Sequence, residues 1–195
     1  MRFVALGVAA ALALGLTACS SDPNSISAQA RSGDRKGFVS GDGTVERIAL
    51  DKREDTVRLK GTTVDGKPWT MDQARGKVLV VNVWGSWCGP CVSEAGDLQQ
   101  TWSSYEKANK PVQFLGLDFK EGPDAGAAFL RSRGITYPSL AYDGGAPVLA
   151  LRGKAPTVPT TLVLDTRGRI AARVLGPVQD STLSGLVDDV LAEKA

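Results

Sequence analysis

Two cysteines separated by two residues are the side chains best suited to do chemistry in this chain. Cys88 and Cys91 enclose the dipeptide Gly89-Pro90, and the third cysteine, Cys19, lies far from them in the sequence. A thiolate is a strong nucleophile, and two neighbouring thiols can carry two electrons by closing into a disulfide. The spacing therefore predicts a redox couple that exchanges disulfides with other molecules and needs no cofactor.

Two other interpretations of the cysteine pair stay open at this point. The pair could be half of a zinc site, but such a site needs four ligands, and carboxylates would have to supply what Cys19 does not. The pair could also be a structural disulfide, although a bridge across two residues restrains the unfolded chain far less than a long-range one. We therefore expect no metal ligand in the site.

The composition excludes several other kinds of chemistry. The 195 residues contain no histidine, which rules out Ser-His-Asp and Cys-His catalysis and histidine-bound zinc or copper. The formal net charge is +2 and the basic residues are scattered, so no surface for nucleic acid is expected. A reactive thiol in this chain must therefore be activated by a helix terminus rather than by an imidazole.

The cysteine pair is expected at a junction between a strand and a helix. Residues 78–83 are almost all aliphatic, which is typical of a central strand buried on both faces. A helix with apolar residues along one face then extends to about residue 108. Unpaired N–H groups and the helix dipole at its start would favour a thiolate. We therefore expect an exposed Cys88 to attack and a shielded Cys91, one turn later, to resolve.

The residues around the first cysteine suit that position. Pro90 fixes φ for the first helical turn and lacks an N–H group that would have no partner there. Gly89 has no side chain, so the backbone of another protein can approach closely. We expect Trp87 to shield Cys88 and to form part of the surface that recognises the substrate.

The rest of the chain alternates between strand-like and helix-like segments. Helices that recur between strands predict an α/β fold, with a mixed central sheet and helices on both faces. The expected elements are a short hairpin within 57–67 that turns at Asp65-Gly66, strands at 112–118 and within 137–142, helices at 123–134 and 146–151, a hairpin of 160–165 with 169–175, and a closing helix at 180–193.

The N-terminal residues predict an export signal and an anchor. Residues 1–18 have one positive charge and then an apolar run that is too short to span a membrane. The run ends in Leu16-Thr17-Ala18-Cys19, which resembles the lipobox of bacterial lipoproteins and implies a lipidated Cys19. The alternative is an ordinary cleaved signal that leaves Cys19 as a free thiol. Residues 19–44 are polar and predict a flexible tether to a domain at 45–195, held at the extracytoplasmic face of the cell membrane.

The stretch from Val83 to Cys91 resembles the active site of the thioredoxin superfamily, and more narrowly of its TlpA/ResA-like extracytoplasmic branch, which includes CcsX-like lipoproteins. The resemblance implies a thioredoxin-like fold with an N-terminal β-hairpin extension. It also implies that Pro159 follows a cis peptide bond and packs against the cysteine pair, and that Val158 offers backbone hydrogen bonds to the substrate. The alternative is an ordinary loop proline in the trans form.

Two polar residues near the pair match the ResA-like branch. Asn82 stands where cytoplasmic thioredoxins have a buried Asp, so no carboxylate at that point can pass a proton to Cys91. Glu94 matches a glutamate of the branch in position, and the alternative is a solvated charge on the outside of the helix. Gly89-Pro90 instead matches the thioredoxin dipeptide, and Gly96 replaces a proline of the branch.

The resemblance implies a membrane-anchored thiol–disulfide oxidoreductase that acts on protein disulfides or dithiols. We expect it to reduce the thiols of apocytochrome c during cytochrome c maturation, as a monomer, and to be recharged by a CcdA-like membrane electron donor. One alternative is a DsbE-like oxidant or general thiol carrier for secreted proteins. Another is a non-catalytic metallochaperone on the same fold, which would need a wider cysteine spacing and a histidine that this chain lacks.

Overall fold

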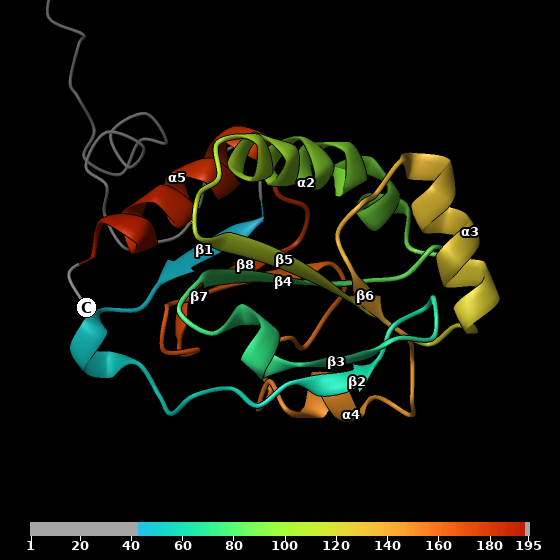
Figure 1. The fold of residues 1–195 in the computed structure, drawn as a ribbon, viewed down its shortest axis with the longest axis horizontal. Coiled ribbons are helices and arrows are strands. Elements are labelled where there is room, and N and C mark those ends of the chain that lie inside the picture. Colours follow the sequence, from blue (N-terminus) through green and yellow to red (C-terminus); the bar gives the residue numbers. More distant parts are fainter. Residues whose placement is uncertain (1–42, 194–195) are drawn as a thin grey trace, which may run out of the picture.

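A computed structural model describes residues 43–193 of the chain (Figure 1). The signal at residues 1–18, the lipidated Cys19 and nearly all of the tether lie outside the described residues, so these expectations stay predictions. Within the described part, no helix combines the length and the apolar composition needed to cross a membrane.

A six-stranded mixed sheet forms the centre of the domain. Its strand order is β1-β8-β7-β4-β5-β6. The central strand β4 pairs in parallel with β5 and antiparallel with β7. All seven residues of β4 are buried, as its aliphatic run predicts. The strands are β1 (Thr44–Arg47), β4 (Val78–Trp84), β5 (Val112–Asp118), β6 (Ser139–Leu140), β7 (Thr160–Leu164) and β8 (Ile170–Leu175).

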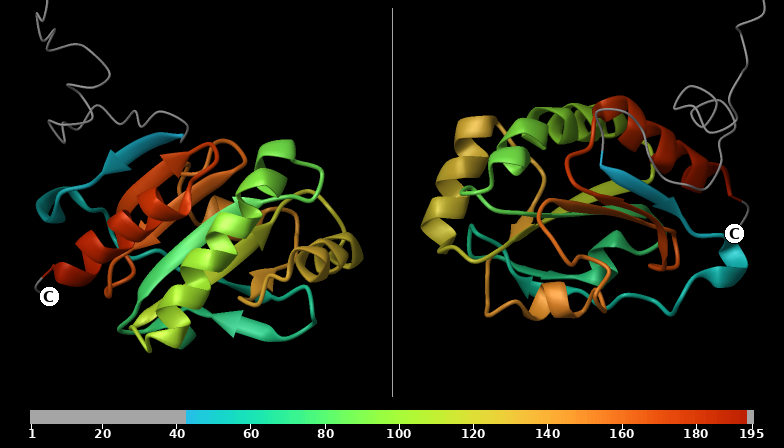
Figure 2. Two further views of the ribbon diagram at one scale, coloured as in Figure 1. Left: turned by 90° about the horizontal axis from the view of Figure 1, so that it is seen from above. Right: turned by 180° about the vertical axis from the view of Figure 1, so that it is seen from behind.

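Two long helices cover one face of this sheet. Helices α2 (Gly89–Lys107) and α5 (Asp180–Ala192) lie side by side across it (Figures 1 and 2). The buried residues of α5 recur every three or four positions, which is the spacing of a helix with one apolar face. The resulting core cluster includes Val78, Val80, Leu98, Tyr105, Phe114, Leu183, Leu186 and Val187.

A hairpin and short helices cover the opposite face. Strands β2 (Lys60–Thr62) and β3 (Pro68–Thr70) pair antiparallel on either side of the Asp65-Gly66 turn, where Gly66 has a φ of +83°. The 3-10 helix η2 (Met71–Ala74) and the four-residue helix α4 (Ala146–Leu149) lie beside this hairpin (Figure 1). The core cluster between these elements and the sheet includes Val57, Leu59, Trp69, Leu79, Val81, Leu115, Leu151 and Leu162.

Helix α3 (Pro123–Arg133) closes the domain at the β6 edge of the sheet (Figure 1). Pro123 stands in its first turn, and Gly134 ends it with a φ of +64°. This helix carries Leu130 into a third apolar cluster, which contains Trp84 and both cysteines of the predicted redox pair. Helix α3 thus contributes one side of the predicted site.

The N-terminal edge strand β1 was not expected from the sequence. Only Val45 of its four residues is buried, so the segment has no alternating pattern that would indicate a strand. Tertiary pairing with β8 determines it instead. Arg53, which follows the 3-10 helix η1 (Leu50–Lys52), is nearly fully buried and forms ion pairs with Asp165 and Glu193 at 3.0 Å and 2.5 Å. These contacts fasten the N-terminal segment to the sheet and to the end of the chain.

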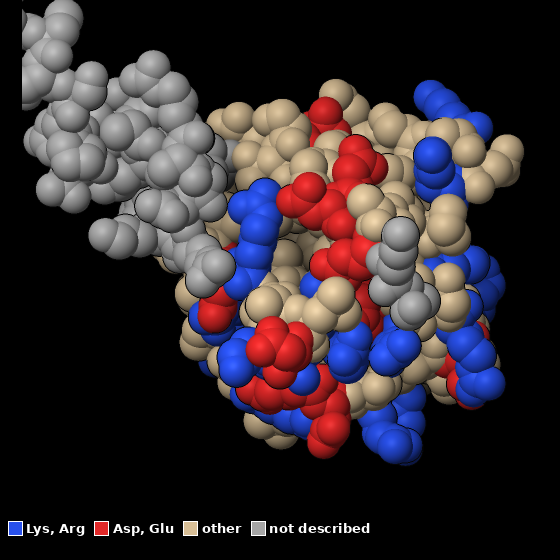
Figure 3. All heavy atoms as spheres, turned by 90° about the vertical axis from the view of Figure 1, so that its left-hand side faces the viewer, with Lys and Arg blue, Asp and Glu red and all other residues tan. Residues whose placement is uncertain are grey.

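Charged side chains of both signs are mixed on the surface near this N-terminal segment. Lys and Arg occur beside Asp and Glu across the face drawn in Figure 3, and neither sign covers that face alone. This mixture agrees with the near-neutral charge of the whole sequence.

Candidate active site

Cys88 and Cys91 form a disulfide at the start of α2, directly after the central strand. Cys88 is the N-cap residue, and its Sγ accepts a hydrogen bond from the backbone N–H of Cys91 at 3.2 Å. The first N–H groups of a helix have no partner within the helix, and they stabilise negative charge. When the pair is reduced, this N–H group is already placed to stabilise a thiolate on Cys88, as the sequence predicts.

The disulfide is more deeply buried than the sequence predicts. Cys88 is 5% exposed and Cys91 is 2% exposed. The expectation of an exposed Cys88 is wrong for the oxidised pair, because both cysteines pack in a cluster with Trp84 and Leu130, against which Val158 also packs. Cys88 nevertheless keeps the larger exposed fraction, which suits the attacking sulfur.

The surface next to Cys88 is open and contains the two residues between the cysteines. Gly89 and Pro90 are both exposed. A β-carbon added to Gly89 would have no other atom within 4 Å, so the space beside this residue is free. The surface beside Gly89 is therefore open, and the approach of another polypeptide across it stays a prediction.

Trp87 forms the exposed aromatic side of the site. It is 55% exposed, and its Nε1 donates a hydrogen bond to the carbonyl of Phe119 at 3.0 Å. A β-carbon on Gly85 would lie 2.6 Å from that nitrogen, so only glycine fits beneath the indole ring. The ring is thus held in place while most of it stays free for contact with a partner.

Glu94 lies inside the protein, not on the outer face of the helix. It is 2% exposed, and its Oε1 accepts a hydrogen bond from Nδ2 of Asn82 at 2.9 Å, while its Oε2 accepts one from the N–H of Val178 at 2.9 Å. Asn82 also donates to the hydroxyl of Thr161 at 3.1 Å. Burial raises the pKa of Glu94 to about 8, although both hydrogen bonds favour the ionised form. The alternative of a solvated charge is therefore wrong.

Asn82 connects this buried carboxyl to the cysteine pair. Besides binding Glu94, it lines a small cavity together with Cys91, Trp84 and Tyr137. A cavity of this kind has room for about one water molecule, which needs polar partners such as the Asn82 amide. Asn82 therefore lies between the buried carboxyl of Glu94 and the small cavity beside Cys91.

Pro159 follows a cis peptide bond, as the family resemblance implies. It is buried, and its carbonyl accepts a hydrogen bond from the N–H of Gly176 at 3.0 Å. Val158 is half-buried and packs against the cluster that contains Cys88 and Cys91. The loop therefore reaches the cysteine pair from a distant part of the sequence, and the backbone contact of Val158 with a substrate stays a prediction.

A family match extends over most of the chain and covers all of these residues. Residues 49–190 match the family described as Redoxin. The chain is a member of the Redoxin family. The matched span includes the cysteine pair, Glu94 and the cis Pro159, so the family covers the whole site.

Three proteins similar to this chain agree on the chemistry. The thiol:disulfide interchange protein HelX of Rhodobacter capsulatus is 31% identical over 144 residues, or 74% of this chain and 78% of HelX. The thiol-disulfide oxidoreductase ResA of Bacillus anthracis is 27% identical over 129 residues, or 66% of this chain and 72% of ResA. A secreted thiol-disulfide isomerase from Corynebacterium glutamicum has a TM-score of 0.71 and 26% identity, over 80% of this chain and 97% of that one. This Redoxin chain is accordingly a thiol–disulfide oxidoreductase with a thioredoxin-like fold.

The loop between β5 and α3 supplies residues of the Redoxin site that the sequence did not point to. Glu121 accepts a hydrogen bond from the N–H of Ser86 at 2.6 Å and another from the Ser86 hydroxyl. Asp118, at the end of β5, is 3% exposed. The only signal in the sequence was that Asp118 is an acid at the end of a buried strand, and this position does not indicate which loop its carboxyl contacts.

Proposed function

We propose that this oxidoreductase is a lipid-anchored extracytoplasmic protein that reduces the thiols of apocytochrome c. The observation that supports disulfide exchange most directly is the N-cap position of Cys88, whose sulfur accepts the Cys91 N–H. Resemblance to the ResA-like branch supports the substrate, and ResA and HelX proteins are among the relatives. The lipobox-like residues Leu16–Cys19 support the anchor.

The exchange proceeds in two displacements. The Cys88 thiolate attacks one sulfur of the substrate disulfide, a mixed disulfide forms, and the other substrate sulfur leaves and takes up a proton. Cys91, once it has lost its proton, then attacks the sulfur of Cys88, and the second substrate sulfur leaves and takes up a proton. The substrate gains two electrons and two protons, and the Cys88–Cys91 disulfide forms. A CcdA-like dithiol donor returns the pair to its reduced state.

The reduction potential of the pair tests the direction of this reaction. The Gly89-Pro90 dipeptide is that of thioredoxin, whose potential is about −270 mV. A value in that region, measured by equilibration with glutathione, supports the reductant. A value near about −120 mV, as in strong oxidants, would instead favour the alternative of an oxidant for secreted proteins.

Trapping with Cys91→Ser tests the substrate. Without the resolving sulfur, Cys88 keeps its substrate as a mixed disulfide that can be isolated and identified by mass spectrometry. The double variant with Cys88→Ser added is the matched control, because it has no attacking sulfur. We expect apocytochrome c among the trapped proteins. If trapped proteins appear but never include it, the substrate assignment fails while the exchange activity stands.

Replacement of Cys19 tests the anchor. With Cys19→Ala, the full chain has no sulfur for lipid attachment, so the protein should leave the membrane fraction and lose incorporation of labelled fatty acid. Retention of the variant in the membrane fraction would contradict the lipid anchor and leave the exchange chemistry untouched.

A further inference from the structure

Asp118 is a buried acid that has no hydrogen-bond donor of its own. It lies opposite Trp84 at the end of β5, and both of its carboxyl oxygens are buried without a donor among the described residues. The nearby N–H of Phe119 donates to the carbonyl of Trp84 at 2.9 Å. Gly126 of α3 packs so closely that a β-carbon there would overlap Oδ2 of Asp118. The fold thus encloses this carboxyl closely, and the only N–H near it in the described part of the chain, that of Phe119, is shared with the carbonyl of Trp84.

The polar group that faces Asp118 is another carboxyl. The carboxyl of Glu121 neighbours that of Asp118, and it raises the pKa of Asp118 through hydrogen bonding and through its charge. Two ionised carboxylates cannot hydrogen-bond to each other, and at this separation they repel. One proton between them supplies the missing donor and removes one negative charge. The arrangement is therefore satisfied only when the pair holds one proton.

Glu121 in turn holds the segment that carries the attacking cysteine. Its two oxygens accept the N–H and the hydroxyl of Ser86, and Ser86 lies two residues before Cys88. The N–H of Cys88 donates to the carbonyl of Gly85 at 3.1 Å, which closes this segment into a turn. The position of Cys88 therefore depends on Glu121 staying where it is.

We propose that Asp118 is a positioning residue for disulfide exchange: it shares one proton with Glu121, and the pair fixes Ser86 and hence Cys88 in the reactive position. When the shared proton leaves to solvent, both carboxylates are charged, and their repulsion moves Glu121 away from Ser86. This inference goes beyond the proposed substrate and anchor, because it concerns the exchange reaction with any disulfide.

The charges around the pair favour the shared proton near neutral pH. Burial, followed by the neighbouring Glu121, raises the pKa of Asp118 to about 8, although the N–H of Phe119 favours the ionised form. The ammonium group of Lys120 lies over the ring of Phe119, 5.0 Å from its centre. The positive end of α3 favours the ionised form. The other acids and bases on the packed elements are Asp124 of α3, the Asp65–Lys67 ion pair of the hairpin turn and Glu94 of α2.

The test compares exchange rates across pH in the reduced, full-length protein. The rate with oxidised glutathione is divided by the thiolate fraction of Cys88, which is measured separately by its ultraviolet absorbance. In the wild type this rate per thiolate should fall about tenfold between about pH 7 and about pH 9.5, as the pair loses its proton and Cys88 shifts. With Asp118→Asn, whose amide donates to Glu121 at every pH, the rate per thiolate should stay constant.

Matched variants separate positioning from a general effect of charge. Asp124→Asn removes an exposed acid from the start of α3 and should keep the wild-type fall with pH. If Asp118→Asn does not fold, Glu121→Gln takes its place, because Glu121 is only half-buried and its amide can still accept from Ser86. A fall in rate that is the same in the wild type and in the Asp118 or Glu121 variant would overturn the proposal. Carboxyl carbon NMR that shows both acids ionised at neutral pH would also overturn it.

Discussion

Replacing Glu94 with Gln measures the proton that the folded protein holds next to Cys91. Burial raises the pKa of Glu94 from 4.5 to about 8 in the folded state, whereas the unfolded chain ionises near the ordinary value. Between these two values the folded protein binds a proton that the unfolded chain has lost. The free energy of unfolding therefore falls as the pH rises through this window. The stabilising contribution of Glu94 is fully present at pH values below its pKa in the unfolded chain. It is lost as the pH rises to its pKa in the folded protein.

The magnitude follows from the size of the window. One full proton gives a slope of about 1.4 kcal/mol per pH unit, so the contribution of Glu94 falls by about 3 kcal/mol between about pH 5 and about pH 8. Gln cannot ionise, so the difference between the wild type and Glu94→Gln isolates this change. The Asn82 amide can turn over so that its oxygen accepts from the amide that replaces the carboxyl, which keeps the buried hydrogen bond.

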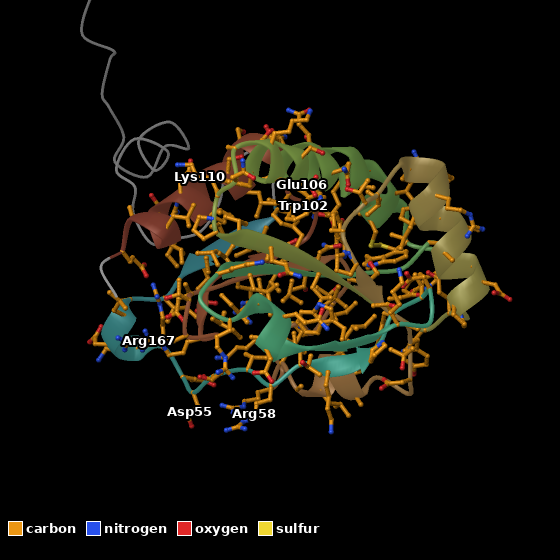
Figure 4. All side chains as sticks on the ribbon, in the orientation of Figure 1. Asp55, Arg58, Trp102, Glu106, Lys110 and Arg167 are labelled. Carbon is orange, nitrogen blue, oxygen red and sulfur yellow. A yellow bond between two sulfur atoms is a disulfide. The ribbon has the colours of Figure 1, made fainter. Side chains whose placement is uncertain are left out.

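The assay is urea unfolding of the oxidised protein at several pH values. Other titrating groups, including Asp118, are the same in both proteins and cancel in the difference. Glu106→Gln is the matched control, because Glu106 lies on the same helix (Figure 4) and is exposed. A difference that does not change with pH would refute the reasoning. It would mean that the N–H donors of Asn82 and Val178 outweigh burial and keep Glu94 ionised.

Three further replacements test parts of the architecture. Trp87→Ala should slow exchange with a protein disulfide about tenfold, with little change toward glutathione and under about 1 kcal/mol loss of stability, because the ring is 55% exposed. Gly116→Ala should lower stability by about 1–3 kcal/mol in thermal unfolding, since its β-carbon would lie 2.6 Å from Nε1 of Trp84. Arg53→Met leaves the buried Asp165 without this partner and should cost about 3 kcal/mol in urea unfolding, whereas an unchanged midpoint would show that the ion pairs add nothing.

The sequence predicted the elements whose own residue pattern indicates how they are buried. The aliphatic run of β4, the strand β5 and the one apolar face of α5 each appear where expected. Strand β1 escaped prediction because it has one buried residue, and pairing with β8 rather than its own pattern makes it a strand. The local residue pattern indicates which positions of a helix or central strand are buried. It does not indicate which edge strand of the sheet a short segment will pair with.

The sequence predicted the parts of the site that belong to a motif, but not the parts that depend on tertiary packing. Cys88 and Cys91 lie together as expected, Pro159 follows a cis peptide bond as the resemblance implies, and Val158 before it packs against the cysteine cluster. The burial of Glu94 could have been predicted from its position in the helix. The buried residues of α2 recur at intervals of three and four, and Glu94 lies on that face, although a charged residue is usually expected at the surface. The burial of Cys88 could not be predicted, since it depends on contact with Leu130 from a different helix.

The absence of histidine gives the two buried acids their importance. Disulfide exchange must add and remove protons near neutral pH, and imidazole is the side chain whose ordinary pKa lies there. This chain has none, so an ordinary carboxyl, with a pKa near 4, would be fully ionised and could donate no proton. Burial raises the pKa of both Glu94 and Asp118 to about 8, one beside the resolving cysteine and the other beside the loop of the attacking cysteine. Low exposure therefore gives two carboxyls near the cysteine segment pKa values in the range where imidazole titrates.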